Sequence, residues 1–347
     1  MSRPPKRITM AQVAELAGVS VMTASYTYNK PGRVSTESRA KVLAAAESLG
    51  YPGPDPSARS LRRGRTGSLG VVLGESLTYA FEDPQAASFL AGVAEVCAAR
   101  GLGMTILPVT GADDDGVRVR EAAVDSFIVW TTTDEDPVLD AILATGRTTV
   151  VHGGPARDGA KLVTIDNRAA AAAIGGLVFA GSRQPAVLGF PLDRERIQRV
   201  ERGIDPHAAT YPVTRERLFG YRDAAQAAGH AWADITVAVC STNNAVEAEA
   251  LAAQLLGSAG PPDAIAAMSD EQAAGVMRAA DRLGVRVPLE LAVSGWDDAA
   301  VASQLGITTV AQSMRDQGKA CALVAVGAGR QRTAEPWSIV ARASTGG

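Results

Sequence analysis

The sequence has few of the residues that usually carry catalysis, metal binding or disulfide bonds. Only three cysteines and three histidines occur among 347 residues, and the cysteines lie far apart in Ala- and Val-rich surroundings. This spacing excludes a disulfide framework and the common zinc patterns, and it suits the reducing cytosol. We therefore expect a cytoplasmic protein that has neither a metal site nor a cofactor.

Long apolar runs and catalytic motifs are absent as well. The longest apolar run, residues 169–180, is too short to span a bilayer, and the basic N-terminus has no apolar core of a signal peptide. There is no P-loop, no G-x-S-x-G motif and no histidine with a Ser or Cys partner in a recognisable setting. The sequence therefore predicts neither a membrane protein nor an enzyme.

Charged residues are common but unevenly distributed. Residues 1–66 hold eleven Lys and Arg against four Asp and Glu, a net charge of +7, whereas the rest of the chain has a net charge of −10. A basic head on an acidic body is typical of a DNA-binding module attached to another domain. A solvated basic tail would explain the charge, but not the helix signals in the same residues.

Three short helices are predicted within residues 9–51. Each begins with a side chain that can cap a helix, and these residues are Thr9, Ser20 and Ser35. Gln12 completes a capping box with Thr9, and the second helix runs from Val21 to about Tyr28. A helix, a tight Gly-containing turn and a second helix form the helix-turn-helix, whose second helix enters the major groove of DNA. A generic three-helix bundle is the alternative.

Apolar spacing predicts how these helices pack together. The first helix has three apolar residues on one face, and the third can cover the first two helices with four more. These residues are Val13, Leu16 and Ala17, followed by Val42, Leu43, Ala46 and Leu49. The core of the head is therefore expected to include Leu16 and Leu43.

Several longer stretches carry a resemblance to a known family. They are VAELAGVSVMTASYTYN, VSTESRAKVLAAAESLGY and ARSLRRGRTGSLGVVL, then RLFGYRDAAQAAG, PDAIAAMSDEQAAGVMRAADRLGVRVP, LAVSGWDD and TTVAQSMRDQGKACA. In order and spacing they resemble the LacI/GalR (lactose-repressor/galactose-repressor) family of transcription regulators over close to the whole chain. The resemblance implies a DNA-binding head, a hinge and an effector-binding domain.

The resemblance and the groove geometry select the candidate DNA contacts. In the head these are Thr9, Ser20, Val21, Met22, Thr23, Ser25, Tyr26 and Asn29. The family commonly has Arg where this chain has Tyr26, and a tyrosine cannot make a bidentate contact to guanine. The operator sequence therefore cannot be carried over from other members. Thr23 and Thr27 fit a phosphate contact and plain solvent exposure equally well.

A stiff PGPDP break at residues 52–56 is followed by a short basic segment, residues 57–65. This segment resembles the family's hinge helix, which forms only when two subunits sit on DNA. The resemblance implies that Leu61 wedges into the minor groove while Arg59, Arg62 and Arg63 neutralise phosphates. A plain basic linker is the alternative.

From Ser68 onward, short apolar strands alternate with Ala-rich helices. This pattern predicts an α/β fold with parallel sheets covered on both faces. The resemblance implies two Rossmann-like lobes, as in type I periplasmic binding proteins. The expected domains are 1–53 for the helix-turn-helix head, 54–67 for the hinge and 68–347 for effector binding and dimerisation, with lobe 1 at about 68–167 plus 313–333 and lobe 2 at about 168–312 plus 334–347.

Ligands of parallel sheets bind beyond the carboxyl ends of the strands, so residues at these ends are candidate ligand contacts. They are Arg217, Asp297, Trp296, Ser269, Gln312, Tyr79, Phe81 and His152. By resemblance Asp297 and Arg217 contact the effector, and Trp296 can stack on a sugar ring. Helix capping and rim packing are the alternatives. Residues 191–212 fit either a lid or a disordered insertion.

These features predict a homodimeric, ligand-responsive DNA-binding regulator, most consistent with a repressor at the nucleoid. Two heads would bind a pseudo-palindromic double-stranded operator, and residues 86–100 would contribute dimer contacts, with a tetramer as an alternative. A sugar-like effector would bind between the lobes, as an inducer or equally as a corepressor. The competing functions are a solute-binding protein, which would need an export signal, and a cleft enzyme, for which no nucleophile is found.

Overall fold

The computed structural model describes residues 8–54, 64–74, 81, 83–329 and 335–346. The chain divides into two compact units, the head (residues 1–67) and the body (residues 68–347). In the described part of both units, no helix has the length and apolar character needed to cross a membrane.

The described residues of the head form three α-helices and one short 3-10 helix. These are α1 (Met10–Ala17), α2 (Val21–Asn29), η1 (Pro31–Arg33) and α3 (Thr36–Leu49). The three predicted caps are confirmed, since the side chains of Thr9, Ser20 and Ser35 each accept a backbone N–H bond from the first turn. Gln12 accepts the backbone N–H of Thr9 at 2.9 Å, which completes the capping box.

Small side chains fill the core of the head. The almost fully buried residues are Val13, Ala14, Ala24, Val42, Ala45 and Ala46. The predictions for Leu16 and Leu43 are wrong, because these side chains are 57% and 44% exposed. The buried stripe of α1 follows Val13, Ala14 and Ala17, and Leu16 lies about 100° from its centre. Alanines at the contacts let the helices cross closely and leave both leucines at the edge.

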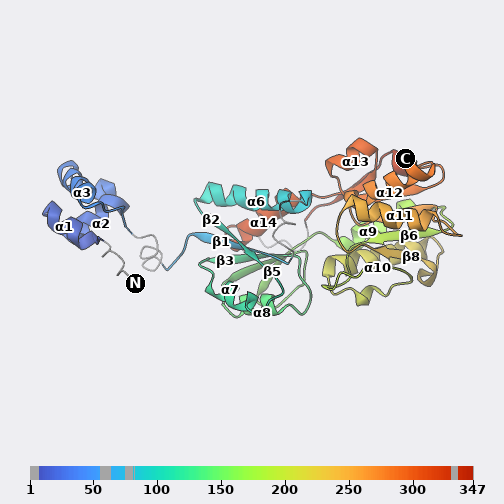
Figure 1. The fold of residues 1–347 in the computed structure, drawn as a ribbon, viewed down its shortest axis with the longest axis horizontal. Coiled ribbons are helices and arrows are strands. Elements are labelled where there is room, and N and C mark those ends of the chain that lie inside the picture. The colour runs from blue at the N-terminus through green and yellow to red at the C-terminus, as the bar shows by residue number, and fades with distance from the viewer. Residues whose placement is uncertain (1–7, 55–63, 75–80, 82, 330–334, 347) are drawn as a thin grey trace, which may run out of the picture. The chain divides into compact units, whose positions relative to one another are not determined.

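Lobe 1 of the body is built on a five-stranded parallel sheet in the order β2-β1-β3-β4-β5. Its strands are β1 (Ser68–Leu73), β2 (Gly103–Pro108), β3 (Ser126–Trp130), β4 (Thr148–His152) and β5 (Ala160–Val163). One face is covered by α6 (Pro84–Arg100) and α14 (Met314–Ala325), and the other by α7 (Asp115–Glu121) and α8 (Pro137–Leu143) (Figure 1). Val71 packs with the first pair of helices and Val72 with the second, as strand alternation requires.

Lobe 2 contains a seven-stranded sheet in the order β12-β11-β10-β9-β6-β8-β7, whose edge strands β7 and β12 are antiparallel to their neighbours. The strands are β6 (Pro185–Gly189), β7 (Arg199–Arg202), β8 (Thr236–Val239), β9 (Ala264–Ala267), β10 (Ala292–Asp297), β11 (Thr308–Ala311) and β12 (Ser338–Val340).

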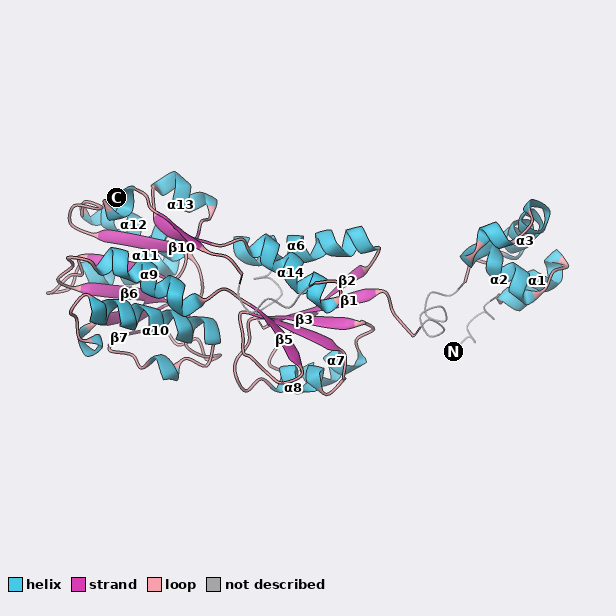
Figure 2. Ribbon diagram, turned by 180° about the vertical axis from the view of Figure 1, so that it is seen from behind, coloured by secondary structure: helices cyan, strands magenta, loops and turns pink. Residues whose placement is uncertain are grey.

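Helices cover both faces of this second sheet (Figure 2). One layer contains α9 (Asn167–Phe179) and α10 (Pro212–Ala227), and the other contains α11 (Ala245–Leu256) and α12 (Asp270–Leu283). Shorter helices are η2 (Pro206–Ala208), η3 (Trp232–Asp234), α13 (Ala300–Leu305) and η4 (Ala343–Thr345). The predicted α/β fold, with a helical head and a body of two parallel-sheet lobes, is confirmed.

Residues 191–212 form an ordered edge of lobe 2 rather than a disordered insertion. Within them, β7 pairs with β8, and the backbone N–H of Thr210 donates to the carbonyl of Leu192 at 2.8 Å. Pro191 and Tyr211, near the ends of the segment, border the cavity between the lobes. The segment therefore contributes to the wall of that cavity.

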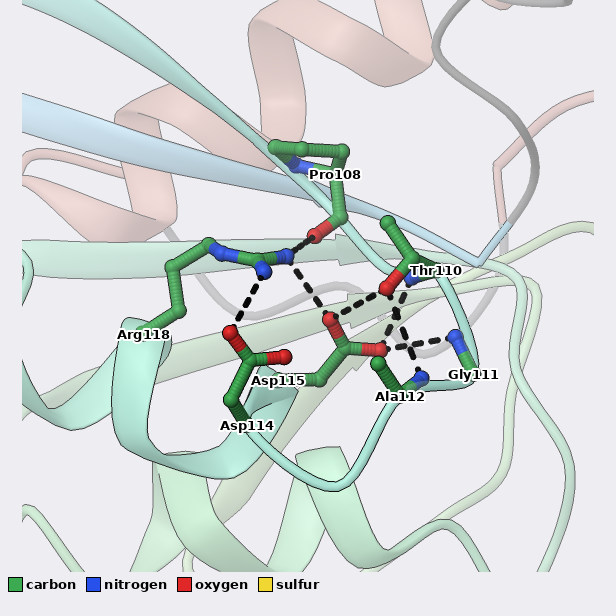
Figure 3. Close-up of polar contacts among 7 residues, drawn as sticks. All are labelled: Pro108, Thr110, Gly111, Ala112, Asp114, Asp115 and Arg118. Carbon is green, nitrogen blue, oxygen red and sulfur yellow. Dashed lines mark hydrogen bonds and ion pairs between the residues drawn. The ribbon is translucent and has the colours of Figure 1, made fainter.

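A buried aspartate closes the loop after β2 in lobe 1 (Figure 3). Asp115 is 2% exposed, and its carboxylate accepts the backbone N–H groups of Thr110 and Gly111, both at 2.8 Å. The guanidinium of Arg118 adds a charged contact at 2.7 Å. Burial by itself would raise the pKa of Asp115, but these donors outweigh it and lower the pKa. The ionised carboxylate thus fixes the loop between β2 and α7.

Candidate functional site

A cavity of about 120 Å³ lies between the two lobes of the body. One buried water needs about 10–15 Å³ of such volume, so the cavity has room for several waters or a small organic molecule. Its walls include the carboxyl ends of β3 and β4 in lobe 1 and of β6 and β10 in lobe 2, together with part of α10. Parallel α/β sheets bind their ligands at this position.

Arg217 projects from α10 to the cavity and is 4% exposed. Its Nε donates to Oδ1 of Asn167 at 3.0 Å, and its Nη1 donates to the carbonyl of Met268 at 2.5 Å. The guanidinium lies 3.8 Å from the ring centroid of Trp296, a cation–π contact. Burial lowers the pKa of Arg217 to about 10, which leaves the group charged at neutral pH. A cation is therefore held in one orientation at the cavity wall.

Four side chains form a hydrogen-bonded chain along the wall, from one lobe to the other. Nε2 of Gln312 donates to Oδ1 of Asp297 at 2.6 Å, and Nε2 of Gln317 donates to Oε1 of Gln312 at 3.0 Å. Oε1 of Gln317 then lies 2.8 Å from Nε2 of His152. Because that amide oxygen can only accept, the chain requires the His152 tautomer with a proton on Nε2.

Burial shifts the ionisable groups at both ends of this chain. It raises the pKa of Asp297 to about 8, although Arg217 and the Gln312 amide oppose the rise. It lowers the pKa of His152 to about 4, so the imidazole is neutral at pH 7. Both ends of the chain are therefore largely uncharged near neutral pH, which favours hydrogen bonding to a ligand over ion pairing.

The structure brings four of the predicted ligand contacts together at the cavity, namely Arg217, Asp297, Gln312 and His152. Trp296 does not border it, because successive strand residues point to opposite faces and Asp297 takes the cavity side. The prediction that Trp296 stacks on a ligand is wrong for this geometry, since its buried ring supports Arg217 instead.

Two other predicted contacts also lie away from the cavity. Ser269 caps α12, and its Oγ donates to Oδ1 of Asn243 at 2.6 Å. Ser269 therefore orients Asn243, which borders the cavity, without bordering the cavity itself. Phe81 is 67% exposed and does not border the cavity, because it precedes the start of α6 on the surface. Tyr79 lies outside the described residues.

Further residues border the cavity without having been predicted. They include Asp83, Gln85, Trp130, Thr131, Asn167, Phe190, Arg196, Tyr211, Asn243 and Gln317. Trp130 ends β3 and Asn243 follows β8, so strand position could have indicated both. Gln317 lies within α14, where no local signal separates it from an ordinary helix residue.

Four of the predicted DNA contacts lie at the start of α2, namely Ser20, Val21, Met22 and Thr23, whereas the others lie further along α2 or, for Thr9, at the start of α1. Val21 and Met22 are 52% and 63% exposed, as apolar side chains that meet base edges need to be. Ser20 caps the helix and accepts the backbone N–H of Thr23 at 3.1 Å. Tyr26 is partly buried, with Nζ of Lys30 6.0 Å from its ring centroid.

Other candidate DNA contacts are held within α2 by burial or by hydrogen bonds to its backbone. Thr27 is 4% exposed and its hydroxyl donates to the carbonyl of Thr23, so the phosphate alternative for Thr27 is wrong. Nδ2 of Asn29 donates to the carbonyl of Ser25 at 3.1 Å, which ties both residues into α2. The hinge candidates Arg59, Leu61, Arg62 and Arg63 lie outside the described residues.

A helix-turn-helix head and a body of two lobes around a cavity define the class of ligand-responsive DNA-binding regulators. Residues 9–53 match the family described as bacterial regulatory proteins, lacI family, and residues 178–345 match the periplasmic binding protein-like domain. The chain is 36% identical to an HTH-type transcriptional regulator of Mycobacterium tuberculosis, over 91% of this chain and 89% of that protein. The chain belongs to the LacI family and is a transcriptional regulator whose DNA binding is controlled by a small ligand.

Solved structures agree with this assignment. A LacI-family regulator from Corynebacterium glutamicum has a TM-score of 0.71 and 28% identity, covering 96% of this chain and 97% of that one. The transcriptional regulator CelR in complex with cellobiose has a TM-score of 0.67 and 25% identity, covering 97% and 100%. The predicted family and regulatory function are confirmed, and the solute-binding alternative is not supported. The relatives are transcriptional regulators, a class that is distinct from enzymes.

Proposed function

We propose that the effector is a small polyhydroxylated molecule, a sugar or sugar-like metabolite, bound in the cavity between the lobes. The hydrogen-bonded chain from Asp297 to His152 carries this proposal, because it lines one wall with oriented polar groups. Arg217 adds a fixed cation, and the rings of Trp130 and Phe190 supply apolar faces of the kind that pack on a pyranose. The related CelR, solved with cellobiose, supports the same ligand class.

The proposal for DNA is that α2 enters the major groove of a pseudo-palindromic operator, once from each subunit of a homodimer. The exposed apolar pair Val21 and Met22 and the +7 charge of residues 1–66 support it. By resemblance, the hinge at residues 57–65 adds contacts in the minor groove. The protein acts as a repressor in the cytosol, effector binding changes operator affinity by moving the lobes, and no catalytic step is involved.

DNA binding is tested by fluorescence anisotropy with a duplex from the region flanking the protein's own gene. Neutralising six or more phosphates releases counterions, so the affinity should fall by about a thousandfold or more between 50 and 200 mM salt. A duplex of the same length and scrambled sequence is the control. A flat salt response, or equal affinity for both duplexes, contradicts the DNA proposal.

The ligand class is tested by a thermal-shift screen of sugars and sugar-like metabolites. Asp297→Asn replaces the carboxyl O–H with an amide NH₂, which can donate but cannot accept a hydrogen bond, and it keeps a side chain type that tolerates the φ of 107° at this position. We expect the variant to bind the effector at least about tenfold more weakly while its operator affinity is unchanged.

Asp298→Asn is the matched control, because Asp298 is adjacent, also has positive φ and does not border the cavity. It should respond to the effector as the wild type does. If Asp297→Asn responds normally, the cavity assignment is wrong.

A further inference from the structure

A second set of side chains joins the two lobes beside the cavity rather than in it. Two ion pairs link the loop after β3 in lobe 1 to lobe 2: Arg194 contacts Asp136, and Arg215 contacts Asp134. None of these four residues borders the cavity. They are called the latch.

The pair of Arg215 and Asp134 is bidentate. Nη2 of Arg215 donates to Oδ1 of Asp134 at 3.1 Å, while Nη1 contacts the other carboxylate oxygen. Each partner is also held by its own lobe: Arg215 donates to the carbonyl of Ala209 at 3.2 Å, and Arg157 donates to the carbonyl of Asp134 at 2.9 Å. Two parallel bonds between pre-oriented groups are stronger than an ordinary surface pair.

The pair of Arg194 and Asp136 differs from the first pair because its carboxylate is almost fully buried. Asp136 is 2% exposed, caps α8 by accepting the backbone N–H of Val138 at 2.8 Å, and lies 2.7 Å from Nη2 of Arg194. The same Nη2 donates to the hydroxyl of Thr132 at 3.3 Å. A nearly buried carboxylate gains more from a cation than an exposed one, since salt and water screen it less.

The latch residues lie close in the sequence to residues that border the cavity. Thr131 precedes the Asp134 loop, Arg196 follows Arg194 by two residues, and Thr214 adjoins Arg215; all three border the cavity. An additional backbone bond crosses the lobes here, from the N–H of Asp134 to the carbonyl of Thr210 at 3.3 Å. Parting the lobes at the rim therefore requires both ion pairs to break.

We propose that Asp134, Asp136, Arg194 and Arg215 form an ion-pair latch that sets the balance between closed and open arrangements of the two lobes. The latch contacts involve only protein atoms, so they favour closure whether or not the cavity is occupied. The inference rests on the proposed function in one respect, that lobe movement is what the effector controls. An effector must then add to or oppose the free energy that these ion pairs contribute to lobe closure. The ionic strength of the solution changes that free energy.

The test is a distance measurement between the lobes of the full chain, with no DNA and no ligand added. Spin labels are placed at Ala144→Cys in lobe 1 and Gln226→Cys in lobe 2, both exposed positions. The native cysteines are buried, so the labels react at the introduced sites. Double electron–electron resonance is recorded at 50 and 500 mM sodium chloride.

We expect Arg194→Gln combined with Arg215→Gln to broaden and shift the distance distribution. The closed-to-open ratio should fall by roughly tenfold, with each pair contributing roughly two- to fivefold. High salt should move the wild type in the same direction but leave the double variant nearly unchanged. Asp134→Arg combined with Arg215→Asp should recover the wild-type distribution, because it restores one pair with reversed charges.

Arg168→Gln is the matched control, because it removes an ion pair with Asp223 at 2.7 Å that lies wholly within lobe 2. It should leave the distribution unchanged, and circular dichroism checks that each variant is folded. A double variant that is folded and has the wild-type distribution at both salt concentrations overturns the latch. Operator affinity is measured separately, so a wild type that fails to bind DNA refutes the proposed function without affecting this result.

Discussion

Asp297 and Asp298 occupy an uncommon backbone conformation at the end of β10. Their φ angles are 107° and 54°, in the region that favours glycine, and each such residue costs on the order of 1–3 kcal/mol. Neighbouring groups hold the turn in place: Gln312 donates to the Asp297 carboxylate, and the backbone N–H of Asp298 donates to the hydroxyl of Thr309 at 3.3 Å. In this conformation Asp297 borders the cavity.

The raised pKa of Asp297 predicts how stability depends on pH. Burial raises that pKa from 3.8 to about 8, so between these values the folded protein binds more protons at this site than the unfolded chain does. Stability contributed by the protonated group is therefore lost as the pH rises through this window. Asp297→Asn cannot titrate, so it should become the more stable form as the pH increases. Because water reaches this partly exposed side chain, we expect a difference of only about 1–2 kcal/mol at pH 8.

The measurement is the unfolding free energy of both proteins in urea at pH 5, 6, 7 and 8. The unfolding free energies of the two proteins should diverge as the pH rises, and the variant should have the higher value. Parallel curves would show that Asp297 ionises normally in the folded protein.

Among the elements, α6 and α14 depend on two glycines for their close crossing. A Cβ built on Gly92 would lie 1.9 Å from the carbonyl oxygen of Arg315, and one built on Gly318 would lie 2.2 Å from the carbonyl oxygen of Phe89. Backbone atoms cannot move aside as flexible side chains can, so the two helices pack at a distance that only glycine permits. This pair covers one face of the lobe 1 sheet and carries Gln317 to the cavity.

Gly92→Ala should therefore destabilise the protein, by about 3 kcal/mol, because the added methyl group forces α6 and α14 apart. Gly176→Ala is the control, since Gly176 lies in α9 with no atom within 4 Å of a built Cβ. That substitution should instead stabilise by about 0.5–1 kcal/mol, through helix propensity. Thermal unfolding of the two variants gives the answer, and equal midpoints would contradict the packing argument.

At the scale of the whole molecule, the chain consists of two units that have separate cores. The buried apolar cluster of the head lies within residues 8–51, and the four clusters of the body lie within residues 69–339. The units also differ in charge, +7 for residues 1–66 and −10 for the rest. The helix-turn-helix and the cavity between the lobes therefore belong to different units of the chain.

A chain starting at Ser68 should fold by itself. We expect it to unfold cooperatively at the same temperature as the body of the full-length protein, because its apolar clusters contain no residue from the described part of the head. The same chain should lose its affinity for any DNA duplex, since it lacks the basic head. Circular dichroism and fluorescence anisotropy measure the two properties. An unfolded or aggregated product would show that the body needs the head.

The sequence by itself determined the features that depend on neighbouring residues. The caps Thr9, Ser20 and Ser35 and the alternation of apolar strands with helices are local signals, and each appears in the structure as predicted. Position after a strand also indicated Asp297 and His152, because the carboxyl ends of parallel strands meet at one edge.

The tertiary structure decided the features that depend on the direction of a side chain and on contacts between residues far apart in the sequence. Only one of the adjacent residues Trp296 and Asp297 can face the cavity, and the packing of β10 selects the aspartate. Leu16 is exposed because alanines set the crossing of the helices, which no single helix pattern reveals. The contact of Asp134 with Arg215 joins residues 81 positions apart, and their proximity follows only from the way the two lobes close on each other.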